Sequence, residues 1–337
     1  MHHCQSRQAR KGATVTEDAS DGSCGHGCHP TSKRRCPTMT YQALARKWRP
    51  KSFDTLTGQE ATVKALSNAL NQQRLHHAYL FTGTRGVGKT TLARILAKCL
   101  NCHEGVSATP CEKCTACEQI NQGRFLDLIE VDAASKTKVE DTRELLDNVQ
   151  YAPSQGRYKV YLIDEVHMLS THSFNALLKT LEEPPEHSKF LLATTDPQKL
   201  PATIISRCLQ FRLSPIDQDA IEQHLSHILH KEQIEFEPAA LTHIAYAAHG
   251  SMRDGLSLLD QAIAHGGEKI ALNDVQHLLG LVDTAPLFAL IEALAQQDKN
   301  NLLQHIAAVT QAGYSYENVL DSVIQMLHNM AMIQIIL

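Results

Sequence analysis

The 337-residue sequence lacks an excess of positive charge. Its formal net charge is −4 and its pI is about 6.5. A protein held to nucleic acid by bulk charge would be far more basic. Any contact with DNA must therefore use a local patch or be shared with partner proteins.

Long apolar runs and closely spaced disulfide cysteines are missing as well. No stretch of about 18 apolar residues occurs, so no transmembrane helix is expected. Residues 1–38 contain no apolar segment of the kind that a secretory signal needs. Ten cysteines in 337 residues fall short of the density of a disulfide-stapled protein. These absences favour a cytoplasmic protein without a membrane partner.

Large apolar residues are scarce in residues 1–38, where Ser, Gly, Thr, His, Lys and Arg dominate. Such a segment cannot bury enough surface to order itself. We interpret it as a disordered tail, or as an artefactual extension ahead of Met39, where the globular pattern begins. Cys24, Cys28 and His29 lie close together in this segment, and metal binding there is a lesser alternative.

The rest of the chain is too long for one compact core, so two or three domains are expected. From about residue 41 to 212, short apolar runs alternate with helical periodicity, which predicts a parallel α/β sheet covered by helices on both faces. The predicted strands are Ala78–Phe81, Leu126–Val131, Val160–Ile163, Phe190–Ala193 and the more mixed Leu209–Leu213.

The strand pattern stops after Pro215, which predicts that the first domain spans 39–215. A small all-helical domain is expected over 216–280, and further apolar-striped helices begin at 281. Because the chain stops within an apolar run, we expect 281–337 to be the start of a third helical domain that is cut short. The helical patterns of the second domain cover 217–232, 238–249, 251–265 and 273–280.

A phosphate-binding loop is predicted at residues 83–90, which match G-x-x-x-x-G-K-[ST] between a predicted strand and a predicted helix. Its backbone N–H groups and the helix dipole would hold phosphates. Lys89 should reach the β- and γ-phosphates, and Thr90 should bind Mg²⁺. The other expected nucleotide-binding residues are Gly83, Thr84, Arg85, Gly86, Val87, Gly88 and Thr91.

Two acids, Asp164 and Glu165, end the predicted strand that starts at Val160. Ligands bind at the carboxyl edge of such sheets, so both carboxylates are expected beside the loop. Asp164 would help to hold Mg²⁺, and Glu165 would polarise the attacking water as general base. Strands often end in acids, but the combination with the loop predicts hydrolysis of a nucleoside triphosphate.

A metal site is predicted within residues 99–120, where four cysteines are spaced as C-x8-C-x2-C-x2-C. Two overlapping C-x-x-C hooks and a fourth thiolate suit tetrahedral Zn²⁺, and four protein ligands leave no open position, which indicates a structural metal. An iron–sulfur cluster or redox pairs are the alternatives. Cys99 and Cys208 fall in helix and strand patterns and are expected to pack in the core. The four expected ligands are Cys102, Cys111, Cys114 and Cys117.

Four longer segments resemble the gamma/tau subunit of the bacterial DNA polymerase III clamp loader, an AAA+ ATPase. The resemblance extends from about residue 40 to 337 and implies an ATPase domain, a helical lid and a helical collar that joins subunits. ATP, Mg²⁺ and structural Zn²⁺ are then the expected cofactors. The segments are RKWRPKSFDTLTGQE (46–60), HHAYLFTGTRGVGKTTLARILAK (76–98), KVYLIDEVHMLSTHSFNALLKTLEEPPEH (159–187) and FLLATTDPQKLPATIISRCLQF (190–211).

The resemblance implies a motor subunit that loads the sliding clamp onto primer–template DNA. ATP binding would organise a spiral of subunits that opens the clamp and grips DNA, and hydrolysis would release both. The implied partners are further gamma/tau copies, the delta and delta-prime subunits, the beta clamp and DNA. Contacts with the polymerase core and the helicase would lie beyond Leu337.

Three further site residues follow from motifs shared with the family. Thr195 matches sensor 1 beside the γ-phosphate, although a strand-end cap would also explain it. Arg207, in Ser-Arg-Cys, matches an arginine finger for the neighbouring subunit's ATP, whereas an isolated Arg is usually a solvated surface residue. Arg253 matches sensor 2, the lid arginine that contacts the γ-phosphate.

Arg253 also has an argument of its own, because Gly250 would end one helix and Ser251 would cap the next. A cation in the first turn of a helix is destabilised by the helix dipole by roughly 0.3–1 kcal/mol. Its presence at this position is explained if an anion binds beside it. Three other basic residues match positions that face DNA in the family, although spacing alone would make them a solvated face. They are Lys136, Lys138 and Arg143.

The sequence supports three other functions less well. The cysteine insertion and the Ser-Arg-Cys motif argue against another AAA+ machine, such as a Holliday-junction branch-migration motor. A non-catalytic subunit like delta-prime has a degraded phosphate loop, whereas Lys89, Thr90 and both acids are present here. A zinc-dependent DNA-binding protein without catalysis would need the excess of positive charge that this chain lacks.

Overall fold

The computed structural model describes residues 42–135, 148–267, 269–280, 284–311 and 316–336. The predicted tail, residues 1–38, lies outside the described residues. So do the three predicted DNA contacts Lys136, Lys138 and Arg143. No helix in the described ranges has the length and apolar character needed to cross a membrane.

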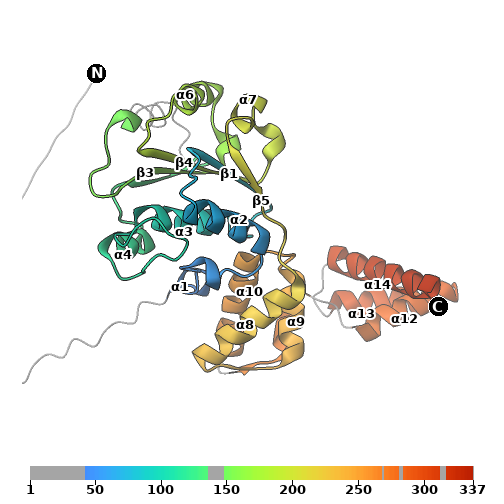
Figure 1. Cartoon of the computed structure of the whole chain (residues 1–337). Coiled ribbons are helices and arrows are strands. Elements are labelled where there is room, and N and C mark those ends of the chain that lie inside the picture. The colour runs from blue at the N-terminus through green and yellow to red at the C-terminus, as the bar shows by residue number, and fades with distance from the viewer. Residues whose placement is uncertain (1–41, 136–147, 268, 281–283, 312–315, 337) are drawn as a thin grey trace, which may run out of the picture. The chain divides into compact units, whose positions relative to one another are not determined.

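Five parallel strands form the sheet of the first domain, in the order β2-β3-β4-β1-β5 (Figure 1). All five predicted strands are confirmed, with shifts of one or two residues at their ends. Leu126 precedes its strand and is 65% exposed, although its apolar character placed it in the predicted run. The strands are β1 (Ala78–Thr82), β2 (Leu128–Asp132), β3 (Lys159–Asp164), β4 (Ser188–Thr194) and β5 (Leu209–Arg212).

Helices cover both faces of this sheet, as the continuous apolar runs of a parallel sheet require (Figure 1). Successive side chains of a strand point to opposite faces. Tyr79 and Phe81 of β1 accordingly pack with the layer of α2 (Glu60–Asn71) and α3 (Lys89–Asn101), while Leu80 packs with the opposite layer. That second layer contains α6 (Thr171–Glu182) and α7 (Ala202–Ile205).

Short elements complete this domain. Helix α4 lies beside α3 in Figure 1. In the segment that leads into α2, the 3₁₀-helix η1 packs on this domain. The short helix α1 packs on the second domain instead, where Leu44 is part of the core and its N–H donates to Oδ2 of Asp260 at 2.8 Å. The short elements are α1 (Leu44–Lys47), η1 (Phe53–Thr55), α4 (Thr115–Gln122), η2 (Asn148–Gln150), η3 (Val166–Met168) and η4 (Pro197–Lys199).

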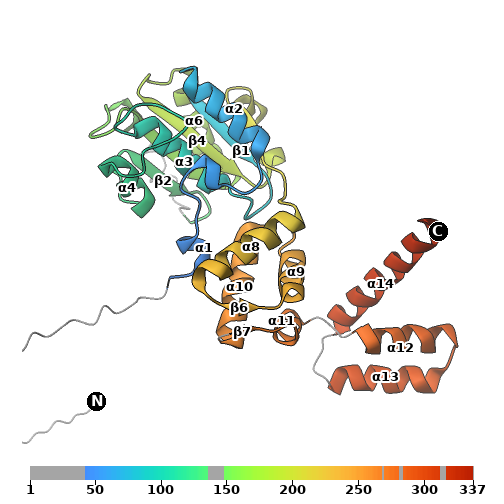
Figure 2. The same ribbon diagram turned by 60° about the horizontal axis from the view of Figure 1, so that its bottom comes forward.

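The second domain has the four predicted helices, packed around Leu225, Ile244 and Leu259. The expectation of an all-helical domain was wrong in one detail, because β6 (Glu235–Phe236) pairs in parallel with β7 (Lys269–Ile270) (Figure 2). Strands of two residues are too short to leave a periodic pattern in the sequence. The helices are α8 (Gln218–Glu232), α9 (Pro238–Ala247), α10 (Met252–Gly266) and α11 (Leu272–Leu279).

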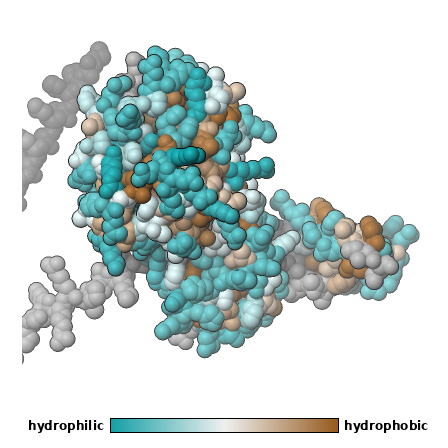
Figure 3. Space-filling view, in the orientation of Figure 1, coloured by the Kyte–Doolittle hydropathy of each residue, from teal (hydrophilic) through white to brown (hydrophobic). Residues whose placement is uncertain are grey.

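Three helices follow, α12 (Thr284–Ala295), α13 (Lys299–Gln311) and α14 (Tyr316–Ile336). They share a small apolar core that includes Leu287 and Val309. Much of their apolar surface stays exposed, as the hydrophobic side chains on this part in Figure 3 show. On α14 the exposed large apolar residues are Tyr316, Leu320, Ile324, Leu327, Met330, Met332, Ile333 and Ile335.

Candidate nucleotide site and metal centre

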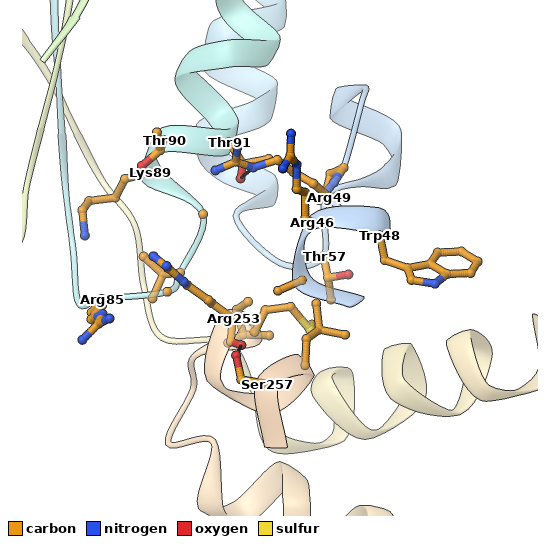
Figure 4. A pocket seen from close by; sticks show the side chains of 18 of the residues that line it. Arg46, Trp48, Arg49, Thr57, Arg85, Lys89, Thr90, Thr91, Arg253 and Ser257 are labelled. Atoms are coloured by element: carbon orange, nitrogen blue, oxygen red, sulfur yellow. Dashed lines mark hydrogen bonds between the residues drawn. The ribbon is translucent and has the colours of Figure 1, made fainter. Parts of the chain in front are cut away.

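The predicted phosphate loop connects the end of β1 to the first turn of α3 and borders a cavity of about 820 Å³ (Figure 4). The segment before α2, the end of β3 and the start of α10 supply the other walls. Most of the predicted site residues meet here. Those that line the cavity are Arg85, Gly86, Val87, Gly88, Lys89, Thr90, Thr91, Asp164, Glu165 and Arg253.

Gly86 is the point at which the loop touches the second domain. Its φ is +78°, and a Cβ placed on it would lie 1.8 Å from Oγ of Ser251, so a larger residue would require the Ser251 side chain to move. Ser251 caps α10 by accepting a hydrogen bond from the Asp254 N–H at 3.2 Å. Arg253 therefore stands in the first turn of α10 beside the loop, as the Gly-Ser pattern predicts.

Lys89 is buried, with 6% of its surface exposed. Its Nζ donates to the carbonyl oxygens of Gly83 and Thr84, each at 2.9 Å. Burial lowers the pKa of Lys89, and the charges of Glu165 and Asp164 oppose that shift. The ammonium thus rests on the carbonyls of its own loop, within reach of any phosphate bound there.

The two predicted Mg²⁺ ligands are in direct contact. Thr90 Oγ1 donates to Oδ2 of Asp164 at 2.6 Å, and Asp164 Oδ1 accepts from the Glu165 N–H at 3.0 Å. A hydroxyl and a carboxylate beside a phosphate site are the oxygen donors that Mg²⁺ prefers, since it also keeps waters and phosphate oxygens. The donor set therefore fits Mg²⁺.

Glu165 follows β3 in the left-handed region, with φ 48° and ψ 46°, which is uncommon for a residue other than Gly. Its Oε2 accepts two hydrogen bonds from Thr195, from the N–H at 3.1 Å and from Oγ1 at 2.9 Å. Thr195 follows β4, which lies between β3 and β1 in the sheet. His167 Nδ1 lies 3.4 Å from the same oxygen. Thr195 thus contacts Glu165 but is not among the residues that line the cavity.

Arg207 lies apart from the phosphate loop of its own chain. It is absent from the cavity wall, and its side chain is 34% exposed. The guanidinium donates to Oε1 of Glu182 at 2.8 Å and to the carbonyl of Thr203 at 2.9 Å. Arg207 thus contacts Thr203 and Glu182 and is not brought together with the residues of the phosphate loop.

The four predicted metal ligands converge, with all four Sγ atoms within 4.8 Å of one another. Tetrahedral Zn²⁺ with Zn–S bonds of about 2.3 Å would space its sulfurs by about 3.8 Å. Backbone N–H groups already point at two of the sulfurs, from Cys111 to Cys102 at 3.4 Å and from Cys117 to Cys114 at 3.5 Å. The arrangement fits a tetrathiolate metal site.

Cys99 and Cys208 stand outside this cluster. Both are buried among apolar side chains, as predicted. Burial raises the pKa of the Cys99 thiol to about 12 and that of the Cys208 thiol to about 11. These thiols stay protonated at neutral pH and serve as packing residues.

Comparison with known protein families gives three matches in succession. Residues 58–217 match the model described as DNA polymerase III, delta subunit. Residues 220–268 match the ATPase lid domain of a DNA polymerase III clamp loader subunit. Residues 270–337 match domain III of DNA polymerase III subunits gamma and tau.

The curated relatives show whether the chain is related to the delta subunit or to the gamma and tau subunits. The DNA polymerase III subunit gamma of Buchnera aphidicola (subsp. Baizongia pistaciae) is 50% identical over 298 residues, which cover 88% of this chain and 80% of that protein. The chain belongs to the gamma/tau family of DNA polymerase III subunits. The subunit tau of Escherichia coli K12 is 58% identical over 297 residues, and that of Bacillus subtilis 168 is 46% identical over 286. Against these two longer proteins the gamma/tau chain spans about half their length, at 46% and 51%.

Solved structures agree with the gamma/tau family on the fold. The Holliday junction branch migration motor RuvB of Thermotoga maritima superposes with a TM-score of 0.53 at 21% identity, covering 81% of this chain and 90% of that one. Identity at this level shows a shared fold alone. The resemblance to a branch-migration motor therefore concerns the fold and not the function.

Two cations of this gamma/tau chain were missed as site residues by the sequence analysis. Arg46 and Arg49 line the cavity from the segment before α2, and Arg49 Nε donates to Thr91 Oγ1 at 3.2 Å (Figure 4). Burial lowers the pKa of Arg49, as do the charges of Arg94 and Arg253. The basic run RKWRPK was the available signal. Further lining residues that were not predicted include Trp48, Pro50, Leu56, Thr57, Asp132, Ile216, His224 and Met252.

Proposed function

We propose that this chain is an ATP-hydrolysing motor subunit of a bacterial DNA polymerase III clamp loader, which loads the sliding clamp onto primer–template DNA. The observation that carries the proposal is the complete set of Lys89, Thr90, Asp164 and Glu165 around one cavity in a gamma/tau family member. A non-catalytic clamp loader subunit would not need these four side chains together.

The charges around the cavity support a polyanionic ligand. Five cations and three acids line it, which leaves a formal charge of +2 (5 − 3) with His224 neutral. Loop N–H groups and the start of α3 add the partial positive charge of a helix N-terminus. The cations are Arg46, Arg49, Arg85, Lys89 and Arg253, and the acids are Asp132, Asp164 and Glu165.

The chemistry follows from these positions. On nucleotide binding, Lys89 exchanges the carbonyls of Gly83 and Thr84 for phosphate oxygens. Mg²⁺ held by Thr90 and Asp164 would neutralise charge on the phosphates. Glu165 accepts a proton from the attacking water, with its carboxylate oriented by Thr195.

The partners proposed are further gamma/tau copies, the delta and delta-prime subunits, the beta clamp and primer–template DNA. The exposed apolar residues of α14 support assembly with other chains, because contiguous apolar surface marks interaction sites. A role in chromosomal replication would place the protein in the cytoplasm.

Lys89→Ala tests the nucleotide assignment. We expect ATP affinity to fall about 10- to 100-fold and turnover to be lost with it, because charge-assisted hydrogen bonds contribute about 1.5–3 kcal/mol. Equilibrium binding of ATP and phosphate release would be measured on the purified chain. Lys64→Ala, on the outer side of α2, is the control. Normal turnover in Lys89→Ala would disprove the phosphate-loop assignment.

Arg49→Ala tests the cation that the sequence analysis missed. Since the guanidinium is largely buried and bonded to Thr91 in the first turn of α3, its removal should weaken ATP binding about tenfold. Arg74→Ala, which removes an exposed cation remote from the cavity wall, should bind ATP normally. Equal affinities of the two variants would remove Arg49 from the site.

Zinc should be present at one equivalent per chain, bound by the four clustered thiolates. Elemental analysis of freshly purified, reduced protein measures this directly. Deleting residues 1–38 should leave the stoichiometry unchanged. A fall towards zero in the deletion variant would place the metal in the Cys24–His29 segment instead.

A further inference from the structure

Lys98, on α3, is a buried cation whose charge the described protein groups balance poorly. Its side chain is 1% exposed. The ammonium donates to the backbone carbonyl of Lys51 and lies 3.8 Å from Oε1 of Glu112. That separation is too long for a hydrogen bond, and the same oxygen is buried without a hydrogen-bond partner among the described residues. A buried charge in this setting needs a further partner.

Lys98 lies one helical turn before the ligand Cys102, whose N–H donates to the Lys98 carbonyl oxygen at 2.8 Å. Glu112 follows the ligand Cys111 directly, and Cys117 is fully buried. Burial lowers the pKa of Lys98, and the charges of Glu112 and then Cys117 oppose that shift. Lys98 is therefore a neighbour of the cluster through the backbone contact with Cys102 and through Glu112.

A divalent ion on four thiolates carries a formal charge of −2 (4 × −1 + 2). Part of that charge would be buried, because Cys102 and Cys117 are 1% and 0% exposed. Two other cations lie nearby, but Lys113 is exposed, and the exposed Arg157 binds the carbonyls of Cys102 and His103. Solvent screens both, whereas it cannot screen a buried ammonium.

We propose that Lys98 is the built-in counter-charge of a divalent metal–tetrathiolate centre. It is a positioning residue, which stabilises the four thiolates around the metal without binding the metal. The inference rests on the metal assignment of the proposed function, and it adds a residue that the C-x8-C-x2-C-x2-C pattern does not contain. Groups that surround metal ligands typically change metal affinity by about 10- to 100-fold.

The test compares zinc binding by the unaltered chain and by variants of one side chain. Lys98→Met keeps the apolar length without the charge, Lys98→Gln keeps a hydrogen-bond donor towards the Lys51 carbonyl, and Lys98→Arg keeps the charge. Lys113→Met removes an exposed charge from between two ligands and is the matched control. Zinc affinity is measured by competition with the chelator 4-(2-pyridylazo)resorcinol, with circular dichroism and ATP binding as checks of folding.

We expect zinc affinity to fall about 10- to 100-fold in Lys98→Met and Lys98→Gln, and to change less than about threefold in Lys98→Arg and Lys113→Met. Folded Lys98→Gln that holds zinc as tightly as the unaltered chain would overturn the inference. If Lys98→Met and Lys98→Gln do not fold, all three Lys98 variants are refolded with stoichiometric zinc. Recovery of the native circular dichroism spectrum by Lys98→Arg alone supports the counter-charge. Failure of all three variants to recover it overturns the inference.

Glu112→Gln separates the counter-charge from a simple ion pair. If Lys98 served Glu112 alone, removing the carboxylate would weaken zinc binding as much as removing the lysine. We expect Glu112→Gln to stay within about threefold of the unaltered chain, and an effect equal to that of Lys98→Gln would count against the inference. Absence of zinc from the unaltered chain would be a different failure, since it would refute the metal assignment itself.

Discussion

Glu165→Gln is expected to bind ATP almost as well as the unaltered chain and to hydrolyse it about 10²- to 10⁴-fold more slowly, the usual contribution of a general base. The amide is nearly isosteric with the carboxylate, and its oxygen can still accept the two hydrogen bonds from Thr195. What disappears is the capacity to take a proton from water. The proposed Mg²⁺ ligands Thr90 and Asp164 are untouched.

Single-turnover hydrolysis and equilibrium ATP binding measure the two effects separately. Asp164→Asn is the contrasting variant, because it removes a charge from the contact with Thr90 and should weaken the binding of Mg²⁺–ATP itself. Glu118→Gln, at an exposed site on α4, controls for the loss of one carboxylate. If ATP affinity of Glu165→Gln fell as far as its turnover, the assigned division of roles between the two acids would be wrong.

Each part of the site that the sequence predicts is a short continuous segment of the chain. Loop 83–90 joins β1 to α3, and Asp164 and Glu165 end β3, so the positions of all three follow from one local pattern each and from the rule that parallel strands end at one edge. The sheet was predictable for the same reason, since buried parallel strands are continuous apolar runs. Family resemblance placed Thr195 beside this edge, and the structure adds that it donates hydrogen bonds to the carboxylate of Glu165.

The features that the sequence did not predict depend on contacts between distant segments. Arg49 joins the site because its segment lies against Thr91, more than forty residues later, and no local period records that contact. The close approach of Gly86 to Ser251 likewise exists only once the second domain packs on the loop. Lys98 looks like an ordinary helix residue in sequence, and its burial beside the cysteine cluster is visible only in the fold.

We propose that Arg207 serves the ATP of a neighbouring subunit, because it is not among the residues that line the cavity of its own chain. In the free chain the guanidinium rests on Glu182 and on the carbonyl of Thr203. Half of the Glu182 side chain is exposed, at 53%, so this ion pair is weak and easily exchanged for a phosphate on a neighbour. Arginine fingers contribute about 10³–10⁵ in rate, or about 4–7 kcal/mol.

Arg207→Ala should therefore leave ATP affinity of the isolated chain nearly intact and remove most of the stimulation of hydrolysis by clamp and primed DNA in the reconstituted complex. Lys179→Ala, which removes an exposed cation of α6 near Glu182, should be stimulated normally. Mixing Arg207→Ala with Lys89→Ala tests the geometry between subunits, because a Lys89→Ala chain still carries an intact finger. Where that finger meets the intact phosphate loop of an Arg207→Ala chain, activity should return. Weaker ATP binding by the lone Arg207→Ala monomer would mean that the arginine acts within its own chain.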